Sequence, residues 1–173
     1  LAVTGVQTCA LPIYLKFGIC WNVSNGESYF RRMDNIGSFQ STVQVYNGLT
    51  GISRMSRIAS STSCFGVFFT LGDNNVSFAS INFSNTKTTY NTLTATSGSK
   101  LYLSDSVIFA DNPSGTDYFV ALISETSPST NGTQAIRVTE GSPTIAYIGG
   151  GGNFNTDLGY QAVDLIWNSQ ISR

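Results

Sequence analysis

The chain has 173 residues, a formal net charge of −1 and no histidine. Without histidine, the sequence excludes Ser-His-Asp hydrolysis, Cys-His nucleophiles and histidine-ligated zinc or iron, and the nearly neutral balance gives no electrostatic footprint for nucleic acid. Only 11% of the residues are charged, against roughly a quarter in ordinary soluble domains. A folded chain of this kind is solvated by hydroxyls, amides and sugars or is covered by neighbouring subunits, which predicts a place outside the cell or at its surface, or within an assembly.

The first segment of the chain is unlike the rest. Residues 3–13 read VTGVQTCALPI, which resembles, codon for codon, the translation of a common sequencing-library adapter. Read-through segments of this kind are left out of fold reasoning. We therefore expect residues 1–13 to be an adapter-derived artefact, disordered or extended with poor side-chain fit, and the native N-terminus to be missing. Residues 14–173 are then expected to form a single domain.

Strand-like alternation begins directly after this segment. In residues 15–23 the apolar side chains share one face, and residues 24–28 are typical of a turn. Further short segments rich in β-branched and aromatic residues predict strands at 39–46, 64–71, 76–83, 88–94, 101–110, 117–124, 134–139, 144–148 and 160–167. Residues 49–58 have weak helical spacing, which predicts a loop or a single turn.

These elements predict an all-β fold, an antiparallel β-sandwich of about nine or ten strands with jelly-roll topology. No alternation of strands and helices indicates a parallel sheet. We find no internal repeat in the sequence and no linker that would divide residues 14–173. No apolar run approaches the roughly twenty residues that span a bilayer, so we expect no membrane span.

Two cysteines, Cys20 and Cys64, remain outside the adapter-like segment. An even number of cysteines in an extracellular chain predicts a Cys20–Cys64 disulfide. Two buried, reduced thiols are the alternative. The ten acidic residues lie mostly in turn-like segments, where they bond to local backbone. We therefore predict no catalytic residues, although a small glycosidase with two paired carboxylates stays open.

Two kinds of ligand site can be placed on the loops. The segment from Asp111 to Asp117 is rich in oxygen ligands, so calcium bound by these two carboxylates is the one metal considered; a simple turn explains the same residues, and no cofactor is predicted. Four sequons for N-linked sugar begin at Asn22, Asn75, Asn82 and Asn131. Their number is close to chance for this composition, and Asn131 is the best surface candidate.

The composition of residues 14–173 is similar to that of extracellular sandwich domains such as adhesins, pilus-like subunits, carbohydrate-binding modules and jelly-roll capsid proteins. This resemblance implies a non-enzymatic structural subunit of an extracellular assembly, whose partners are other copies of itself and glycans. In some filament families an N-terminal strand completes the sandwich of a neighbour. Residues 15–23 would be that donor, and an ordinary strand of its own sheet is the alternative. The side chains expected to face the neighbour's core are Leu15, Phe17, Ile19, Trp21 and Val23.

A carbohydrate-binding module is the alternative to an assembly subunit. A carbohydrate-binding module would present a row of two or three exposed aromatic side chains across one sheet. The candidates for such a row are Trp21, Tyr29, Tyr46, Tyr90, Tyr102, Tyr147, Tyr160 and Trp167.

Overall fold

A computed structural model of the chain describes residues 3–9, 16–34, 36–48, 53–94, 100–110, 117–126, 131–139 and 144–148. In these ranges the chain forms twelve β-strands in three four-stranded sheets, and every pair of neighbouring strands is antiparallel. The all-β prediction is therefore confirmed.

Each sheet is a meander in which strands follow one another in chain order. Sheet A contains β1 (Val3–Cys9), β2 (Phe17–Val23), β3 (Ser28–Met33) and β4 (Val43–Tyr46). Sheet B contains β5 (Ser53–Ser60), β6 (Cys64–Leu71), β7 (Asn75–Asn82) and β8 (Lys87–Thr94). Sheet C contains β9 (Lys100–Ala110), β10 (Tyr118–Thr126), β11 (Asn131–Thr139) and β12 (Ile145–Tyr147).

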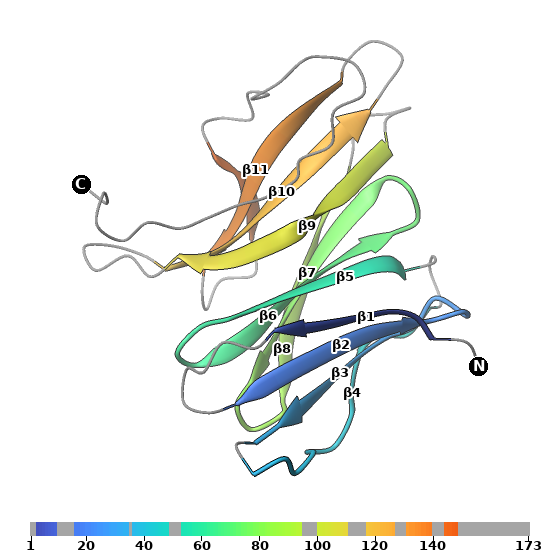
Figure 1. Cartoon of the computed structure of the whole chain (residues 1–173). Helices are drawn as coiled ribbons and strands as arrows, with labels where there is room; N and C mark the ends of the chain where they lie inside the picture. Colours follow the sequence, from blue (N-terminus) through green and yellow to red (C-terminus); the bar gives the residue numbers. More distant parts are fainter. Residues whose placement is uncertain are drawn as a thin grey trace.

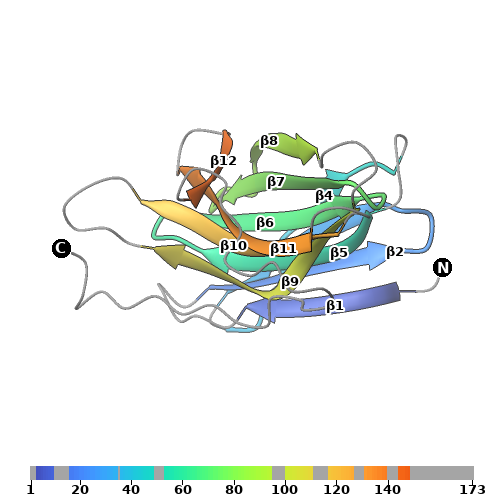
Figure 2. The same cartoon turned by 90° about the horizontal axis from the view of Figure 1, so that it is seen from above.

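The three sheets are stacked as layers, with sheet C above sheet B and sheet B above sheet A in Figure 1. Their first strands lie together, because β1 contacts β5 and β5 contacts β9. On the opposite side of the stack, β8 contacts β12, and Figure 2 shows these two strands at the far edge from β1 and β9. Each sheet therefore runs outward from a common edge formed by the first strands.

Sheet B is the central layer and buries both of its faces. Along β6, Phe65, Val67 and Phe69 pack into a core shared with sheet A. The alternate residues Cys64 and Phe68 pack into a second core shared with sheet C. A strand covered on both sides is expected to be a nearly continuous apolar run, which explains the sequence CFGVFFTL of this strand.

The meander order replaces the predicted jelly roll. A jelly roll interleaves its strands through Greek-key connections, whereas in the described ranges each pairing joins strands that are consecutive in the sequence.

The structure also has more strands than predicted, because β1, β3 and β5 were not expected. The residues of β5 have weak helical spacing, yet their backbone pairs with β6, so tertiary pairing overrides the local pattern. The strand predicted at 160–167 lies outside the described residues.

The adapter-like segment contributes the backbone of β1, which pairs with β2. Backbone N–H and C=O groups of almost any sequence can make such a ladder. The pairing therefore leaves the adapter interpretation a prediction.

Sheets A and B repeat the same turn at a spacing of 48 residues. Asp34 follows β3, its Oδ1 accepts a bond from the backbone N–H of Ser38 (2.8 Å), and its own N–H donates to the Ser38 carbonyl (3.0 Å). Asn82 ends β7, and it makes the same two bonds with Thr86, at 2.9 and 3.0 Å. Asp and Asn side chains of this kind close a local turn by bonding to backbone further along the chain.

The contact between sheets is repeated as well. Gly18 on β2 leaves a notch in sheet A, because a Cβ atom there would lie 2.9 Å from the rings of both Phe30 and Phe65. Phe30 belongs to sheet A and Phe65 to sheet B, and the two rings have centroids 5.1 Å apart at an interplanar angle of 46°. The glycine is therefore required for the close approach of the two sheets.

Forty-eight residues later, Gly66 forms the same notch in sheet B. A Cβ atom at Gly66 would lie 2.5 Å from Phe119 of sheet C and 2.7 Å from Phe78 of sheet B. The rings of Phe78 and Phe119 have centroids 5.3 Å apart at 44°, nearly the geometry of the first interface. Sheets A and B are thus successive copies of one unit, and sheet C continues the stack, although no internal repeat was predicted.

Candidate association surface

The side chains of β2 alternate in the sense opposite to the prediction. Gly18 and Cys20 are buried toward sheet B, whereas Phe17, Ile19 and Trp21 lie on the other face and are partly exposed. The physical reason is the notch: only small side chains on β2 let the strand approach the bulky core residues of sheet B. Val23 is buried at the end of the strand, and Leu15 lies outside the described residues.

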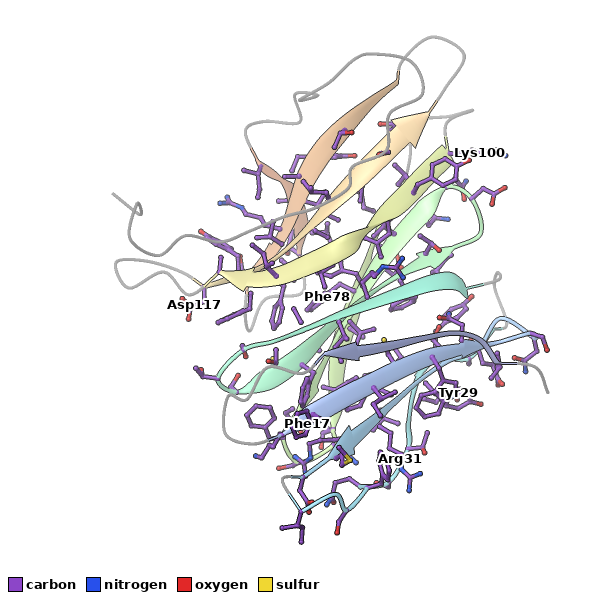
Figure 3. All side chains as sticks on the ribbon, viewed as in Figure 1. Phe17, Tyr29, Arg31, Phe78, Lys100 and Asp117 are labelled. Atoms are coloured by element: carbon purple, nitrogen blue, oxygen red, sulfur yellow. The ribbon has the colours of Figure 1, made fainter. Side chains whose placement is uncertain are left out.

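The face of sheet A that points away from sheet B is called here the outer face of sheet A. It is formed by β2, β3 and β4, and its residues are Phe17, Ile19, Trp21, Tyr29, Arg31, Met33 and Gln44. In Figure 3, Phe17, Tyr29 and Arg31 lie on the lowest layer, whereas Phe78 lies higher, between the middle and upper layers.

In this structure residues 17–23 form an ordinary strand of their own sheet, which is the alternative to the donor strand, and strand donation stays a prediction. β2 is hydrogen-bonded to β1 on one side and to β3 on the other, so it occupies an inner position of its own sheet. A strand whose two edges are both paired has no ladder groups left for a neighbouring subunit. In this sheet β2 therefore offers a neighbour its exposed side chains and not its backbone groups.

Trp21 and Tyr29 form the centre of the outer face. They are directly opposite one another on β2 and β3, and their rings stack with centroids 5.8 Å apart at 21°. Both side chains are partly exposed. An aromatic pair of this kind offers a large, rigid contact area with a polar edge.

A carboxylate closes one end of this face. Glu27 accepts hydrogen bonds from Asn25 Nδ2 (2.7 Å), the Tyr29 hydroxyl (2.9 Å) and Gln44 Nε2 (2.9 Å). The bonds from Asn25, Tyr29 and Gln44 hold the pKa of Glu27 below its usual value. For the same reason, donation to Glu27 raises the pKa of Tyr29. The network fixes the Tyr29 ring against Trp21.

A cation lies toward the other end of the face. Arg31 pairs with Ile19 across β2 and β3, its Nε donates to the carbonyl of Gln40 (2.8 Å), and its guanidinium lies 4.7 Å above the ring of Phe39. The outer face of sheet A is therefore an apolar and aromatic strip with a negative and a positive group along it.

The same positions are deeply buried in the next sheet. The three apolar residues of β2 on this face stand 48 residues before the three of β6 that pack onto sheet A, Phe17, Ile19 and Trp21 before Phe65, Val67 and Phe69. The side chain of Phe65 is 1% exposed, and those of Val67 and Phe69 are 0% exposed. The outer face of sheet A thus has the chemistry of an interface between sheets but stays partly open.

The predicted Cys20–Cys64 disulfide is not formed. Both cysteines are buried, and neither is bonded to another cysteine. Cys20 belongs to the core between sheets A and B, whereas Cys64 belongs to the core between sheets B and C. The two thiols are separated because Cys64 points to the far face of sheet B, where its sulfur lies 3.5 Å from the hydroxyl of Ser61.

The four sequons differ in what they can offer to a sugar. Asn22 is 3% exposed and its Nδ2 donates to the hydroxyl of Ser28 at 2.9 Å, so a sugar on that nitrogen has no room in this fold. Asn82 is committed to the turn described above, and Asn75 is partly buried at the start of β7. The side chain of Asn131 lies outside the described residues.

The predicted calcium loop is only partly described. Asp117 is partly buried just before β10, and Asp111 lies outside the described residues. Within the described ranges, no three His, Cys, Asp or Glu side chains gather into a metal-binding group. Calcium at Asp111 and Asp117 stays a prediction.

Comparisons with known proteins found no match for this chain. No protein-family model, curated protein or solved structure matches the chain. Among the described residues there is no helix of the length and apolarity needed to cross a membrane.

Function is therefore inferred from the geometry of the outer face of sheet A, which sequence reasoning missed. The Phe-Gly pairs at 17–18 and 65–66, each followed by a phenylalanine twelve residues after the glycine, were the pattern that could have indicated it.

Proposed function

We propose that the protein is a non-enzymatic structural module of an extracellular assembly and that it acts by association through the outer face of sheet A. One observation carries this proposal. Phe17, Ile19 and Trp21 are partly exposed at the positions whose counterparts in sheet B are 0–1% exposed. Burying a large apolar side chain contributes about 1.5–3 kcal/mol of favourable free energy. A partner that covers Phe17, Ile19 and Trp21 therefore gains free energy from each of the three side chains.

The low charge of the chain supports the same proposal. A free monomer relies on ionised side chains to stay soluble, and only 11% of this chain is charged. Covering an aromatic strip in an assembly removes the exposed apolar surface that would otherwise promote aggregation. The extracellular location and sugar at Asn131 or Asn75 belong to this proposal.

A carbohydrate-binding module is the second candidate function. The stacked pair of Trp21 and Tyr29 favours it, because aromatic rings beside fixed hydrogen-bonding groups are typical of ligand sites. Glu27 and Gln44 supply such groups next to Tyr29. A soluble polysaccharide that retards the protein in native gels, with the loss of this effect in Trp21→Ala, would favour this candidate.

Sedimentation of the chain tests association directly. The chain is expected to show a mass that rises with concentration, because the partly exposed apolar strips of two copies can cover each other face to face. Phe17→Asp, which places a charge in the apolar strip, is expected to sediment as a monomer. The matched control is Ile36→Asp, since Ile36 is 80% exposed in a turn outside this face and should behave like the native chain. A native chain that stays monomeric at every concentration, with no change in Phe17→Asp, overturns the proposal.

A further inference from the structure

We propose that the three sheets are successive blades of a β-propeller and that the outer face of sheet A binds a preceding blade of the same polypeptide. This inference rests on the proposed function in one respect, because the same face is the interface. It goes further by naming the partner. The partner is a four-stranded meander with a glycine on its second strand and a phenylalanine on its third.

The arrangement of the described strands is that of propeller blades. A propeller repeats four-stranded antiparallel sheets around an axis, and typically 4–8 such blades close the ring. Here three four-stranded meanders pack face to face, and their first strands lie beside one another. The step from sheet A to sheet B is made again from sheet B to sheet C.

The chemistry of the missing partner follows from the repeated contact. At each described interface, a phenylalanine from the second strand of the later sheet meets a glycine notch and a phenylalanine of the sheet before it. Phe65 does this at Gly18, and Phe119 does it at Gly66. Phe17 occupies the corresponding position on the outer face of sheet A, and no described sheet precedes it. The partner must therefore supply the notch and the ring.

Sheet C of a second copy does not fit this description. By register, Val120 stands in sheet C where Gly66 stands in sheet B, and Ala135 stands where Phe78 stands. The last described sheet thus lacks both the glycine and the ring. Val120 and Ala135 are also only 8% and 6% exposed, so neither position offers an open notch to another copy. A further blade with its own glycine and phenylalanine is the occupant that the repeated contact supports.

The repeat also predicts the sequence of that blade. Phe17-Gly18 and Phe65-Gly66 are 48 residues apart, and Phe30 and Phe78 each follow their glycine by twelve residues. The proposal therefore expects the full-length polypeptide to contain a Phe-Gly pair about 48 residues upstream of Phe17-Gly18, with a phenylalanine twelve residues after its glycine.

A tandem chain provides the test. Residues 53–99, which carry sheet B, are duplicated ahead of Leu1 in the full chain, so that the duplicate presents its Gly66 and Phe78 to Phe17. All variants carry Trp167→Phe, which leaves Trp21 as the sole tryptophan. The expected result is a shift of Trp21 emission to shorter wavelength and a severalfold fall in acrylamide quenching, relative to the chain without the duplicate.

The matched control is the same tandem with Gly66→Leu in the duplicate alone. A side chain there fills the notch, so Trp21 should stay as accessible as in the parent chain. A duplicate that folds, judged by resistance to protease, yet leaves Trp21 quenching unchanged overturns the inference. If the duplicate does not fold, the genomic sequence upstream of Phe17 decides, and the absence of the Phe-Gly and phenylalanine pattern overturns the inference. The two proposals can fail separately. If Phe17→Asp abolishes self-association but Trp21 is not protected in the tandem chain, the proposed function stands and the inference of a preceding blade is wrong.

Discussion

Gly18 on β2 and Gly66 on β6 occupy the same place in successive sheets, and each is covered by a phenylalanine of the sheet that follows. The absence of a side chain at these positions sets how closely two sheets approach. Because the covering ring also contacts a phenylalanine of the glycine's own sheet, each notch brings together one glycine and two rings.

Filling one notch should destabilise the fold. In Gly66→Ala the new Cβ would lie 2.5 Å from Phe119 and 2.7 Å from Phe78, so the free energy of unfolding is expected to fall by about 1–3 kcal/mol, as in overpacked cores. Denaturation in urea measures this. The control is Gly37→Asn, because Gly37 has φ +84° and no atom within 4 Å of a Cβ, and asparagine tolerates this backbone. Equal losses of unfolding free energy in Gly66→Ala and Gly37→Asn would show that Gly66 is not required for the close packing of sheets B and C.

The repeated turn predicts which substitution Asn82 tolerates. In Asn82→Ala the backbone N–H groups of Ser84 and Thr86 lose their acceptor, which should lower the free energy of unfolding by about 1–2 kcal/mol. Asn82→Asp should be close to the native chain, because Asp34 performs the same task in sheet A. Urea denaturation of both variants measures the difference. An aspartate variant as unstable as the alanine variant would mean that the two turns are not equivalent.

The Glu27 network gives the stability a dependence on pH. Hydrogen bonds from Asn25, Tyr29 and Gln44 lower the pKa of Glu27 in the folded chain. A lowered carboxyl pKa stabilises the fold above the unfolded value of 4.5, and this contribution is lost as the pH falls through the folded pKa. Between pH 7 and pH 3 the native chain should therefore lose more stability than Glu27→Gln. Identical pH profiles of the urea midpoint would show that the network is not formed.

The two buried thiols should be chemically reduced and protected. In the native state, without reductant, an alkylating reagent should leave Cys20 and Cys64 unmodified because both are buried. In denaturant, again without reductant, both should be alkylated, as peptide mass spectrometry would detect. If these two cysteines resisted alkylation in denaturant until a reductant was added, they would be bridged, as predicted from the even cysteine count.

Sequence reasoning reached the fold class but not the layers. The alternation along β2 correctly indicated a strand, yet it assigned Phe17, Ile19 and Trp21 to the core. Period-two alternation separates two faces without saying which one is inside, and the large side chains were the natural choice. In the structure the face of β2 that carries Gly18 is the buried one, because the ring of Phe65 packs against this glycine. The sequence alone does not show which ring lies opposite a glycine.

The repeat was missed for a related reason. Successive units share only the residues that fix turns and notches, such as Asp34 with Asn82 and Gly18 with Gly66, while most other positions differ. β5 was missed because a strand on the common edge can be polar and still pair with β6. Such pairing is decided by neighbours that are distant in the sequence, not by local propensity.

One series of substitutions tests the central claim, that Phe17 is an interface residue still lacking its partner sheet. Phe65→Ala and Phe119→Ala remove side chains that are 1% exposed, so each should lower the free energy of unfolding by about 3–5 kcal/mol. Phe17→Ala should cost less than about 1 kcal/mol in the same chain, and in the tandem chain with residues 53–99 duplicated its cost should rise to that of the other two. A Phe17→Ala variant that is as destabilised as Phe65→Ala in the original chain, or one whose cost does not rise in the tandem, would contradict the account.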